Sequence, residues 1–255
     1  MKIIKYKKIR NKYRVYLDNE TNIDLYENVI LKNDLLIKKE INDIDKIEKD
    51  NKEEEILDIS IKYIGTKLRT INELEKYLKK KNYSDDNIKK IIDILKNRGL
   101  LNDELYIKSY INDRFNLSSD GPTKIKNDLL NMNLEEEIII KYLSDIENNE
   151  IYEKLDRLIT KKINLNNNYS GDVLKNKIYS YFINLGYDKD MILDILNNKN
   201  LTNIDKGIKE YEKLLSKYKN KYKDYALENI IRQKLYLKGY SLDEIKKSIN
   251  WYSFN

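Results

Sequence analysis

Apolar residues recur at spacings of three and four along most of the chain, a pattern that predicts amphipathic α-helices. This spacing begins near residue 55, and the 255 residues include only one proline and seven glycines. The segment before residue 55 alternates instead, because Tyr13, Val15 and Leu17 fall on one side of an extended chain. We therefore expect a mainly α fold with a small strand-containing head at its N-terminus.

The head is expected to span residues 1–52. Its clearest element is a β-hairpin, in which residues 12–17 and residues 23–26 form two strands around a turn at residues 18–19. The rest of the head is expected to contain a helical turn and a further strand within residues 27–39, and a charged linking helix at residues 43–55.

The body contains an internal repeat, which is typical of helical arrays. Four reference residues, Tyr83, Leu134, Tyr187 and Tyr240, follow one another at intervals of 51, 53 and 53 residues. Apolar residues stand nine and five positions before each of them, and five and nine positions after. Since each pair is spaced by four, it lies on one face of a helix, and two helices flank a fixed corner. The apolar positions are Leu74, Ile125, Ile178 and Ile231; Leu78, Leu129, Phe182 and Leu235; Ile88, Ile139, Ile192 and Ile245; and Ile92, Leu143, Leu196 and Ile249.

The residue before each reference residue is suited to ending a helix. It is Asn82, Asn133, Gly186 or Gly239, and Asn and Gly adopt the left-handed backbone conformation at the lowest cost. This preference gives a physical reason for the corner. Signals for helix starts accompany it: Ser84, Glu135, Asp188 and Ser241 just after the corners, a Thr70–Glu73 capping box, and Gly121-Pro122.

A longer amphipathic stretch precedes each pair of short helices, at residues 54–67, 103–117, 151–165 and 204–218. Each repeat is thus expected to be a three-helix unit of about 50 residues, which is marginally stable alone. Neighbouring units are expected to share apolar faces, so that four tandem three-helix repeats form an elongated array. The expected repeats span residues 53–101, 102–147, 148–199 and 200–255.

Composition excludes several classes of function. The chain has no cysteine and no histidine, which excludes disulfides, zinc sites, thiol nucleophiles and imidazole catalysis. Neither Gly-x-x-x-x-Gly-Lys-Ser/Thr nor Gly-x-Gly-x-x-Gly, the two common nucleotide-binding loops, occurs. We therefore expect no enzyme activity, no cofactor and no metal. The polar N-terminus and the lack of an 18-residue apolar run predict a cytoplasmic protein that does not contact a membrane.

Charge is unevenly distributed, although the whole chain carries only +6. Residues 56–101 and residues 200–255 each carry +5, whereas residues 102–146 carry −4. Because tyrosines lie among the lysines of both basic repeats, these surfaces are able to follow a phosphate backbone and to stack bases. The competing interpretation is a solvated helix face in a lysine-rich chain. Residues 2–14 hold seven positive charges and no acid, and for them protection of an edge strand is a further interpretation.

Three segments, in order, resemble a known family. Residues 68–83 begin L-R-T-I-N-E-L and end K-N-Y, which resembles the R-S-x-x-E-L-x-x-x-L-x-x-K-G-Y/F segment of the RecX family of recombination regulators. Residues 98–106 (R-G-L-L-N-D-E-L-Y) resemble its G-Y-L-D-D-x-x-F/Y run, and residues 110–129 its Y/F-V-x-x-R … G-P-x-R-I-x-x-E-L run. The match covers residues 56–145, and residues 147–255 follow it only through the register of the repeat.

The resemblance implies a protein that acts by binding. RecX-like proteins lie along the groove of the RecA filament on single-stranded DNA and mainly inhibit its ATPase and recombination activity. RecA and, more weakly, single-stranded DNA are therefore the expected partners; the alternatives are a stand-alone nucleic-acid-binding helical-repeat protein and a structural adaptor for another partner. Arginine is informative in this lysine-rich chain, because bidentate and stacked contacts require it. The residues expected to contact the partner or DNA are Lys67, Arg69, Arg98, Arg114, Lys124, Arg232 and Lys234.

Overall fold

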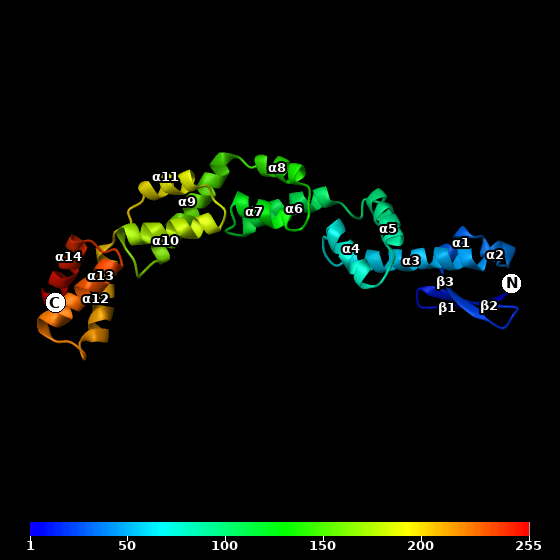
Figure 1. Cartoon of the computed structure of the whole chain (residues 1–255), viewed down its shortest axis with the longest axis horizontal. Helices are drawn as coiled ribbons and strands as arrows, with labels where there is room; N and C mark the ends of the chain where they lie inside the picture. The colour runs from blue at the N-terminus through cyan, green and yellow to red at the C-terminus, as the bar shows by residue number, and fades with distance from the viewer. Residues whose placement is uncertain (255) are drawn as a thin grey trace. The chain divides into compact units, whose positions relative to one another are not determined.

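The computed structural model describes residues 1–254, with side chains described up to residue 250. This part of the chain forms fourteen helices and one three-stranded sheet, which confirms the predicted mainly α fold with a small strand-containing head (Figure 1). The chain divides into two compact units, residues 1–106 and residues 107–255. None of the described helices is both long enough and apolar enough to cross a lipid bilayer.

The first unit begins with an antiparallel sheet whose strands lie in the order in which they occur in the chain. One face of this sheet packs against α1 (Glu27–Lys32), α2 (Leu35–Lys38) and the beginning of α3 (Ile44–Ile64), which lie above it in Figure 1. The buried core between them includes Val15, Leu17, Leu25, Val29, Ile30, Leu35 and Ile47. The strands are β1 (Ile3–Ile9), β2 (Lys12–Leu17) and β3 (Asn22–Tyr26), so the predicted hairpin is present as β2 and β3.

The further strand predicted within residues 27–39 is wrong, because these residues form α1 and α2. The third strand of the sheet is β1, at the start of the chain. A bulge between Ile3 and Lys5 shifts its pairing with β2, so that Ile3 and Tyr6 lie on the same side of the sheet although they are three residues apart. The bulge breaks the period of two, which is why the alternation is not visible in the sequence of β1.

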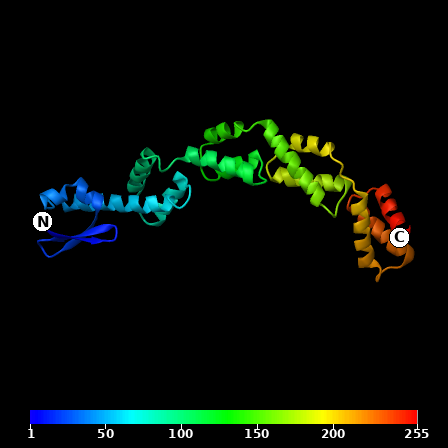
Figure 2. The same cartoon turned by 180° about the vertical axis from the view of Figure 1, so that it is seen from behind.

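From α3 onward, the helices form four successive groups of three, which we call triplets. The helices predicted separately at residues 43–55 and 54–67 are one continuous helix, α3. Figures 1 and 2 show the three helices of triplet 4 side by side. Triplet 1 is α3, α4 (Ile71–Lys80) and α5 (Asp85–Asn97); triplet 2 is α6 (Asp103–Leu117), α7 (Pro122–Leu130) and α8 (Glu136–Ser144); triplet 3 is α9 (Asn148–Leu165), α10 (Gly171–Asn184) and α11 (Lys189–Asn197); triplet 4 is α12 (Ile204–Tyr218), α13 (Asp224–Leu237) and α14 (Leu242–Phe254).

The apolar positions of the sequence repeat form the interior of the triplets. Every residue nine or five positions before a reference residue, or five positions after it, is buried. At nine positions after, Leu196 is buried, whereas Ile92, Leu143 and Ile249 are half-buried, because this position lies toward the end of the third helix. The repeat in the sequence therefore corresponds to a repeated core.

The corner between the second and third helices of each triplet has the left-handed backbone that the sequence predicts. In triplets 1, 3 and 4 the N–H of the reference residue turns back to cap the second helix; in triplet 3, Tyr187 donates to the carbonyl of Phe182 at 3.1 Å. Thr70 and Glu73 form the predicted capping box at the start of α4, and Pro122 begins α7. The φ angles at the corners are 62° at Asn82, 61° at Asn133, 81° at Gly186 and 89° at Gly239.

Consecutive triplets of the second unit dock through their backbones. At the start of α7, the N–H of Thr123 donates to the carbonyl of Gly186 in the corner of triplet 3 at 3.1 Å. The next junction has the same form, because the N–H of Ser170, just before α10, donates to the carbonyl of Lys238 beside the corner of triplet 4 at 2.9 Å. In both junctions, the start of a second helix docks on the corner of the following triplet.

Glycine is required at both corners that take part in these junctions. A Cβ atom on Gly186 would lie 2.3 Å from the backbone nitrogen of Lys124, and a Cβ atom on Gly239 would lie 2.1 Å from the carbonyl oxygen of Ser170. The corners of triplets 1 and 2 carry exposed asparagine side chains instead. The choice between Gly and Asn at a corner thus follows how closely another backbone approaches it.

Candidate functional site

The seven residues predicted to contact a partner lie in three of the triplets. The pair in triplet 2 shares one acidic partner, and the loop that carries this acid lies beside a cleft that is lined by further cations. Lys67 and Arg69 lie between α3 and α4 of triplet 1, and Arg98 directly follows α5. Arg114 and Lys124 belong to triplet 2, and Arg232 and Lys234 to triplet 4.

Asp120 holds the two predicted cations of triplet 2 together. It lies in the loop between α6 and α7 and is only 5% exposed. Lys124 Nζ lies 2.5 Å from its Oδ1 atom, and Arg114 Nη1 lies 3.5 Å from its Oδ2 atom. Burial alone would raise the pKa of Asp120, but the hydrogen bond and charge of Lys124, together with Ser118 and Arg114, outweigh burial and lower it. The carboxylate is therefore ionised at neutral pH.

The backbone carbonyl of Asp120 links this loop to triplet 3. It accepts a hydrogen bond from Lys154 Nζ of α9 at 2.9 Å and one from the hydroxyl of Tyr187, the reference residue of triplet 3, at 3.4 Å. One residue thus contacts α6 and α7 through its carboxylate and triplet 3 through its carbonyl.

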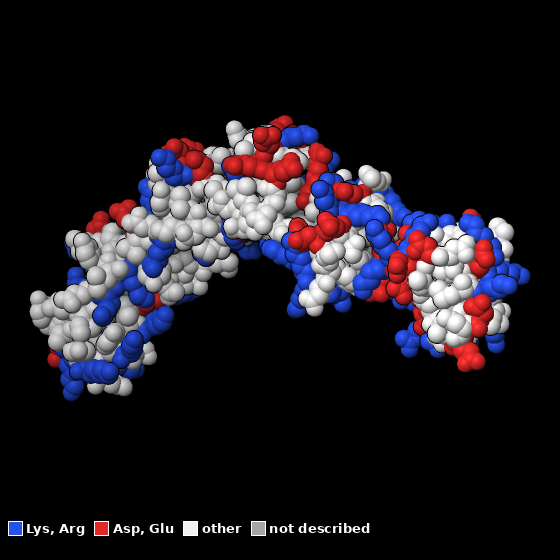
Figure 3. Space-filling model, turned by 45° about the vertical axis from the view of Figure 1, so that its right-hand side comes forward, with Lys and Arg blue, Asp and Glu red and all other residues white. Residues whose placement is uncertain are grey.

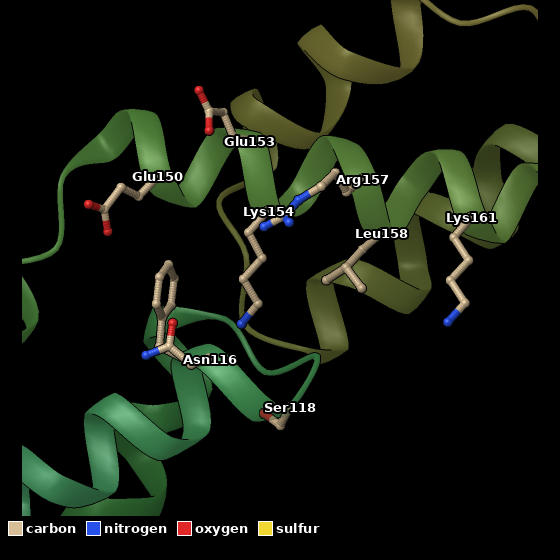
Figure 4. A pocket seen from close by; sticks show the side chains of 9 residues that line it. Asn116, Ser118, Glu150, Glu153, Lys154, Arg157, Leu158 and Lys161 are labelled. Carbon is tan, nitrogen blue, oxygen red and sulfur yellow. The ribbon is translucent and has the colours of Figure 1, made fainter.

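A cleft of about 430 Å³ lies beside this loop, between the end of α6 and the exposed side of α9. Lys154, Arg157 and Lys161 line it from α9, where spacings of three and four place them on one face. Asn116 and Ser118 line the opposite side, and Figure 4 shows Lys154 reaching from α9 toward them. Two glutamates near the start of α9 line the other end, so the cleft has a basic part and an acidic part.

The basic part of the cleft is available to an anionic group. Arg157 and Lys161 are exposed, and neither forms an ion pair with any residue that the structure describes. The guanidinium of Arg157 can bind a phosphate or carboxylate in a bidentate manner, and Lys161 adds a second positive charge one helical turn away. Within residues 1–250, no group of three or more acidic side chains is arranged to hold a metal ion. The chemistry of the cleft is that of binding to an anion.

Lys154 is a buried ammonium group at the inner end of the cleft. It is 7% exposed, and Nζ lies 4.5 Å from the centroid of the Phe115 ring. Desolvation lowers its pKa to about 8; the charge of Asp120 opposes this effect, and the nearby charge of Arg157 adds to it. Folding therefore destabilises the charged form of Lys154.

This lowered pKa predicts that stability rises with pH on the alkaline side. Between pH 8 and pH 10.5 the unfolded chain binds more protons at Lys154 than the folded chain does, so the free energy of unfolding increases with pH. From pH 7.5 to pH 9.5 the expected gain is about 1–2 kcal/mol. Urea denaturation of the protein and of Lys154→Met at both pH values measures it. An equal pH dependence in the two proteins would contradict the assignment.

Arg69 is occupied by contacts within triplet 1. Its guanidinium lies 4.3 Å from the centroid of the Tyr63 ring, and that ring stacks on Tyr77 at 3.9 Å. Arg69 Nη1 donates to Glu73 Oε1 at 3.1 Å, and Lys67 Nζ lies 3.8 Å from the same oxygen. Arg69 therefore fixes the connection between α3 and α4, whereas Lys67 remains largely exposed.

The remaining predicted residues lie on helix surfaces. Arg98, at the end of α5, and Lys234, on α13, are exposed. Arg232 donates to Glu228 Oε1 from Nε at 2.9 Å and from Nη2 at 2.5 Å. The carboxylate of Glu228, one turn earlier in α13, therefore partly neutralises the charge of Arg232. Of the seven, Lys67, Arg98 and Lys234 are the ones whose side chains are mostly open to solvent.

The residues on the α9 side of the cleft were not predicted from the sequence. Arg157 could have been selected from the sequence, because only seven of the 49 basic residues are arginine. Lys154 could also have been selected, since it is spaced by three from Ile151 and by four from Leu158 and thus interrupts the apolar face of a helix. No signal in the sequence marks Asp120, because its role depends on contacts with α6, α7, α9 and the corner residue Tyr187.

Known proteins resemble the chain over its full length, although no family model matches it. The "Regulatory protein RecX" of Streptococcus agalactiae serotype Ia is 30% identical over 260 residues, which cover 99% of this chain and 100% of the relative. The protein of the same name from Lactococcus lactis subsp. lactis is 28% identical, covering 99% and 98%.

Two solved structures share the fold. A "Crystal structure of regulatory protein RecX" matches with a TM-score of 0.67 and 21% identity, covering 77% of this chain and 98% of the other. The "Crystal structure of RecX from Lactobacillus salivarius" matches with a TM-score of 0.54 and 27% identity, covering 57% and 95%. With the S. agalactiae relative matched from end to end, these similarities show that the chain belongs to the RecX family of regulatory proteins.

Proposed function

We propose that this protein binds the RecA recombinase filament on single-stranded DNA and mainly inhibits its ATPase and recombination activity. The observation that carries the proposal is membership of the RecX family over the whole chain. The protein acts in the cytoplasm by binding, catalyses no reaction and needs no cofactor.

The cleft between α6 and α9 supports this proposal. Arg157 and Lys161 offer unneutralised positive charge to DNA phosphates or to acidic side chains of a protein partner, and the glutamates at the other end offer the opposite charge. A surface that carries both signs suits a partner composed of protein and DNA. In this proposal, the exposed members of the predicted set, Lys67, Arg98 and Lys234, add contacts outside the cleft.

The proposal is tested by ATP hydrolysis of RecA from the same organism on single-stranded DNA. We expect added protein to lower the rate, and we expect Arg157→Gln/Lys161→Gln to need about tenfold more protein for the same inhibition, because it removes both free cations of the cleft. Lys246→Gln/Lys247→Gln is the matched control, since these exposed lysines on α14 carry the same charge. An equal loss in both variants would show that net charge, rather than the cleft, is responsible.

The alternative is a stand-alone nucleic-acid-binding protein. It predicts tight binding to bare DNA at physiological salt and an unchanged RecA ATPase rate at equimolar protein, and this pair of results would overturn the proposed regulation. A structural adaptor for another partner predicts neither effect.

A further inference from the structure

The sheet of the head has an exposed face that differs from its buried face. The pairing of β1 with β2 sets Lys5 opposite Tyr16 and Lys7 opposite Arg14. Residues that are paired across two antiparallel strands point to the same side, so these four side chains share one face, which we call the outer face. The residues that alternate with them along β2 belong to the core of the head. The outer face therefore points away from the core.

Most of the positive charge near the outer face is not neutralised within the protein. Arg14 forms a two-point contact with Asp24, at 2.8 and 3.0 Å, and Lys12 Nζ lies 3.9 Å from Glu55. Figure 3 shows Lys and Arg atoms projecting from the lower part of the head, where Figure 1 places the sheet. The other basic residues among residues 2–14 are exposed and form no ion pair with any described residue: Lys2, Lys5, Lys7, Lys8 and Arg10. Of these, Lys5 and Lys7 lie on the outer face, whereas Lys8 is paired with Tyr13 and points to the opposite side.

The arrangement of these cations fits a chain of phosphates. Lys5 and Lys7 are two residues apart on one strand, so their Cα atoms are separated by about 6.6 Å along it. This spacing forms a row of positive charge that an extended single strand can follow. An uncompensated row of this kind attracts a polyanion and contributes little to the stability of the fold.

Tyr16 adds an aromatic ring to the same face. Lys5 Nζ lies 6.0 Å from the ring centroid, which is the outer limit of a cation–π contact, so the ring is not covered by the amine. A base without a pairing partner can stack on such a ring, whereas the bases of a duplex are already stacked on one another. A lipid headgroup offers no flat surface to the ring. The combination favours a single strand.

We propose that the outer face of the head binds single-stranded nucleic acid, with phosphates on Lys5 and Lys7 and a base stacked on Tyr16. This site is distinct from the cleft between α6 and α9. It binds a free single strand in the absence of RecA, so its existence does not depend on the proposed function.

The test measures binding of the full-length protein to a labelled oligothymidylate by fluorescence anisotropy at several salt concentrations, without RecA. We expect Lys5→Gln/Lys7→Gln to raise the Kd about tenfold at low salt and to flatten the plot of log Kd against log salt by about 1.4, which corresponds to two phosphate contacts. Lys46→Gln/Lys49→Gln, which removes two exposed lysines from α3, is the matched control and should change neither quantity.

The aromatic contact is tested separately. Tyr16→Leu is expected to raise the Kd at least about fivefold with an unchanged salt dependence, because stacking carries no charge, whereas Tyr16→Phe retains the ring and the affinity. Thermal unfolding of each variant checks that the head remains folded. Three results would overturn the proposal: equal losses in Tyr16→Phe and Tyr16→Leu, duplex DNA bound with the same Kd as the single strand, or phosphatidylserine vesicles bound in preference to the oligonucleotide.

Discussion

Gly186→Ala is expected to separate triplets 2 and 3 and to lower the free energy of unfolding by about 4 kcal/mol or more. The backbone at Gly186 has a φ of 81°, which costs any residue with a Cβ atom about 1–2 kcal/mol. The new Cβ would also lie 2.3 Å from the backbone nitrogen of Lys124, and backbone cannot move aside as the end of a side chain can. The junction must then open and lose the hydrogen bond between Thr123 and Gly186.

Gly99→Ala is the matched control for this prediction. Gly99 has a similar φ of 68°, but no atom lies within 4 Å of the Cβ position. The control should therefore cost only the backbone strain, about 1–2 kcal/mol. Urea denaturation compares the two variants, and similar losses would show that the close approach of the triplets is not what requires glycine at position 186.

Asp120→Ala is expected to lower the free energy of unfolding by about 2–4 kcal/mol at neutral pH. The substitution removes a buried carboxylate and leaves Arg114 and Lys124 without their common partner, close to the buried ammonium of Lys154. Both cations are partly exposed, so water recovers part of the loss, and the cost stays below that of a fully buried pair.

The pH dependence provides an internal check. Because the pKa of Asp120 is lowered by folding, its contribution is complete above the unfolded value near 3.9 and is lost as the pH falls through the folded value. The difference between the protein and Asp120→Ala should therefore shrink below pH 4. Asp113→Ala, an exposed acid on α6, is the control and should change stability by less than about 0.5 kcal/mol at any pH. A constant difference across the acid range would exclude the ion contacts as its source.

Local features of the fold could be predicted from the sequence. The corner at Gly186 follows from a glycine between two apolar i, i+4 pairs, and the start of α4 follows from Thr70 and Glu73, because left-handed backbone and capping depend on residues within one or two turns. The hairpin of β2 and β3 was also predicted from nearby residues, namely the alternation of apolar side chains and the turn at residues 18–19. The strand β1 was not, because its bulge depends on how it pairs with β2.

The candidate site was only partly predictable. Arg114 and Lys124 were selected from the sequence, but their common partner Asp120 and the cations Lys154 and Arg157 were not. These residues come from α6, α7, the loop between them and α9, and the sequence does not specify how those segments approach one another. The predicted partner contacts of all seven residues stay predictions: Lys67, Arg69, Arg98, Arg114, Lys124, Arg232 and Lys234.

The sequence by itself determined the helices, their corners and the register of the repeated core, because each depends on the conformational preferences and apolar spacing of nearby residues. Only the tertiary structure decided that Gly186 must be glycine, that Asp120 joins two triplets, and that three cations of α9 face one cleft. Those features arise where segments distant in the chain meet, and the distances between such segments are set by packing rather than by local preference.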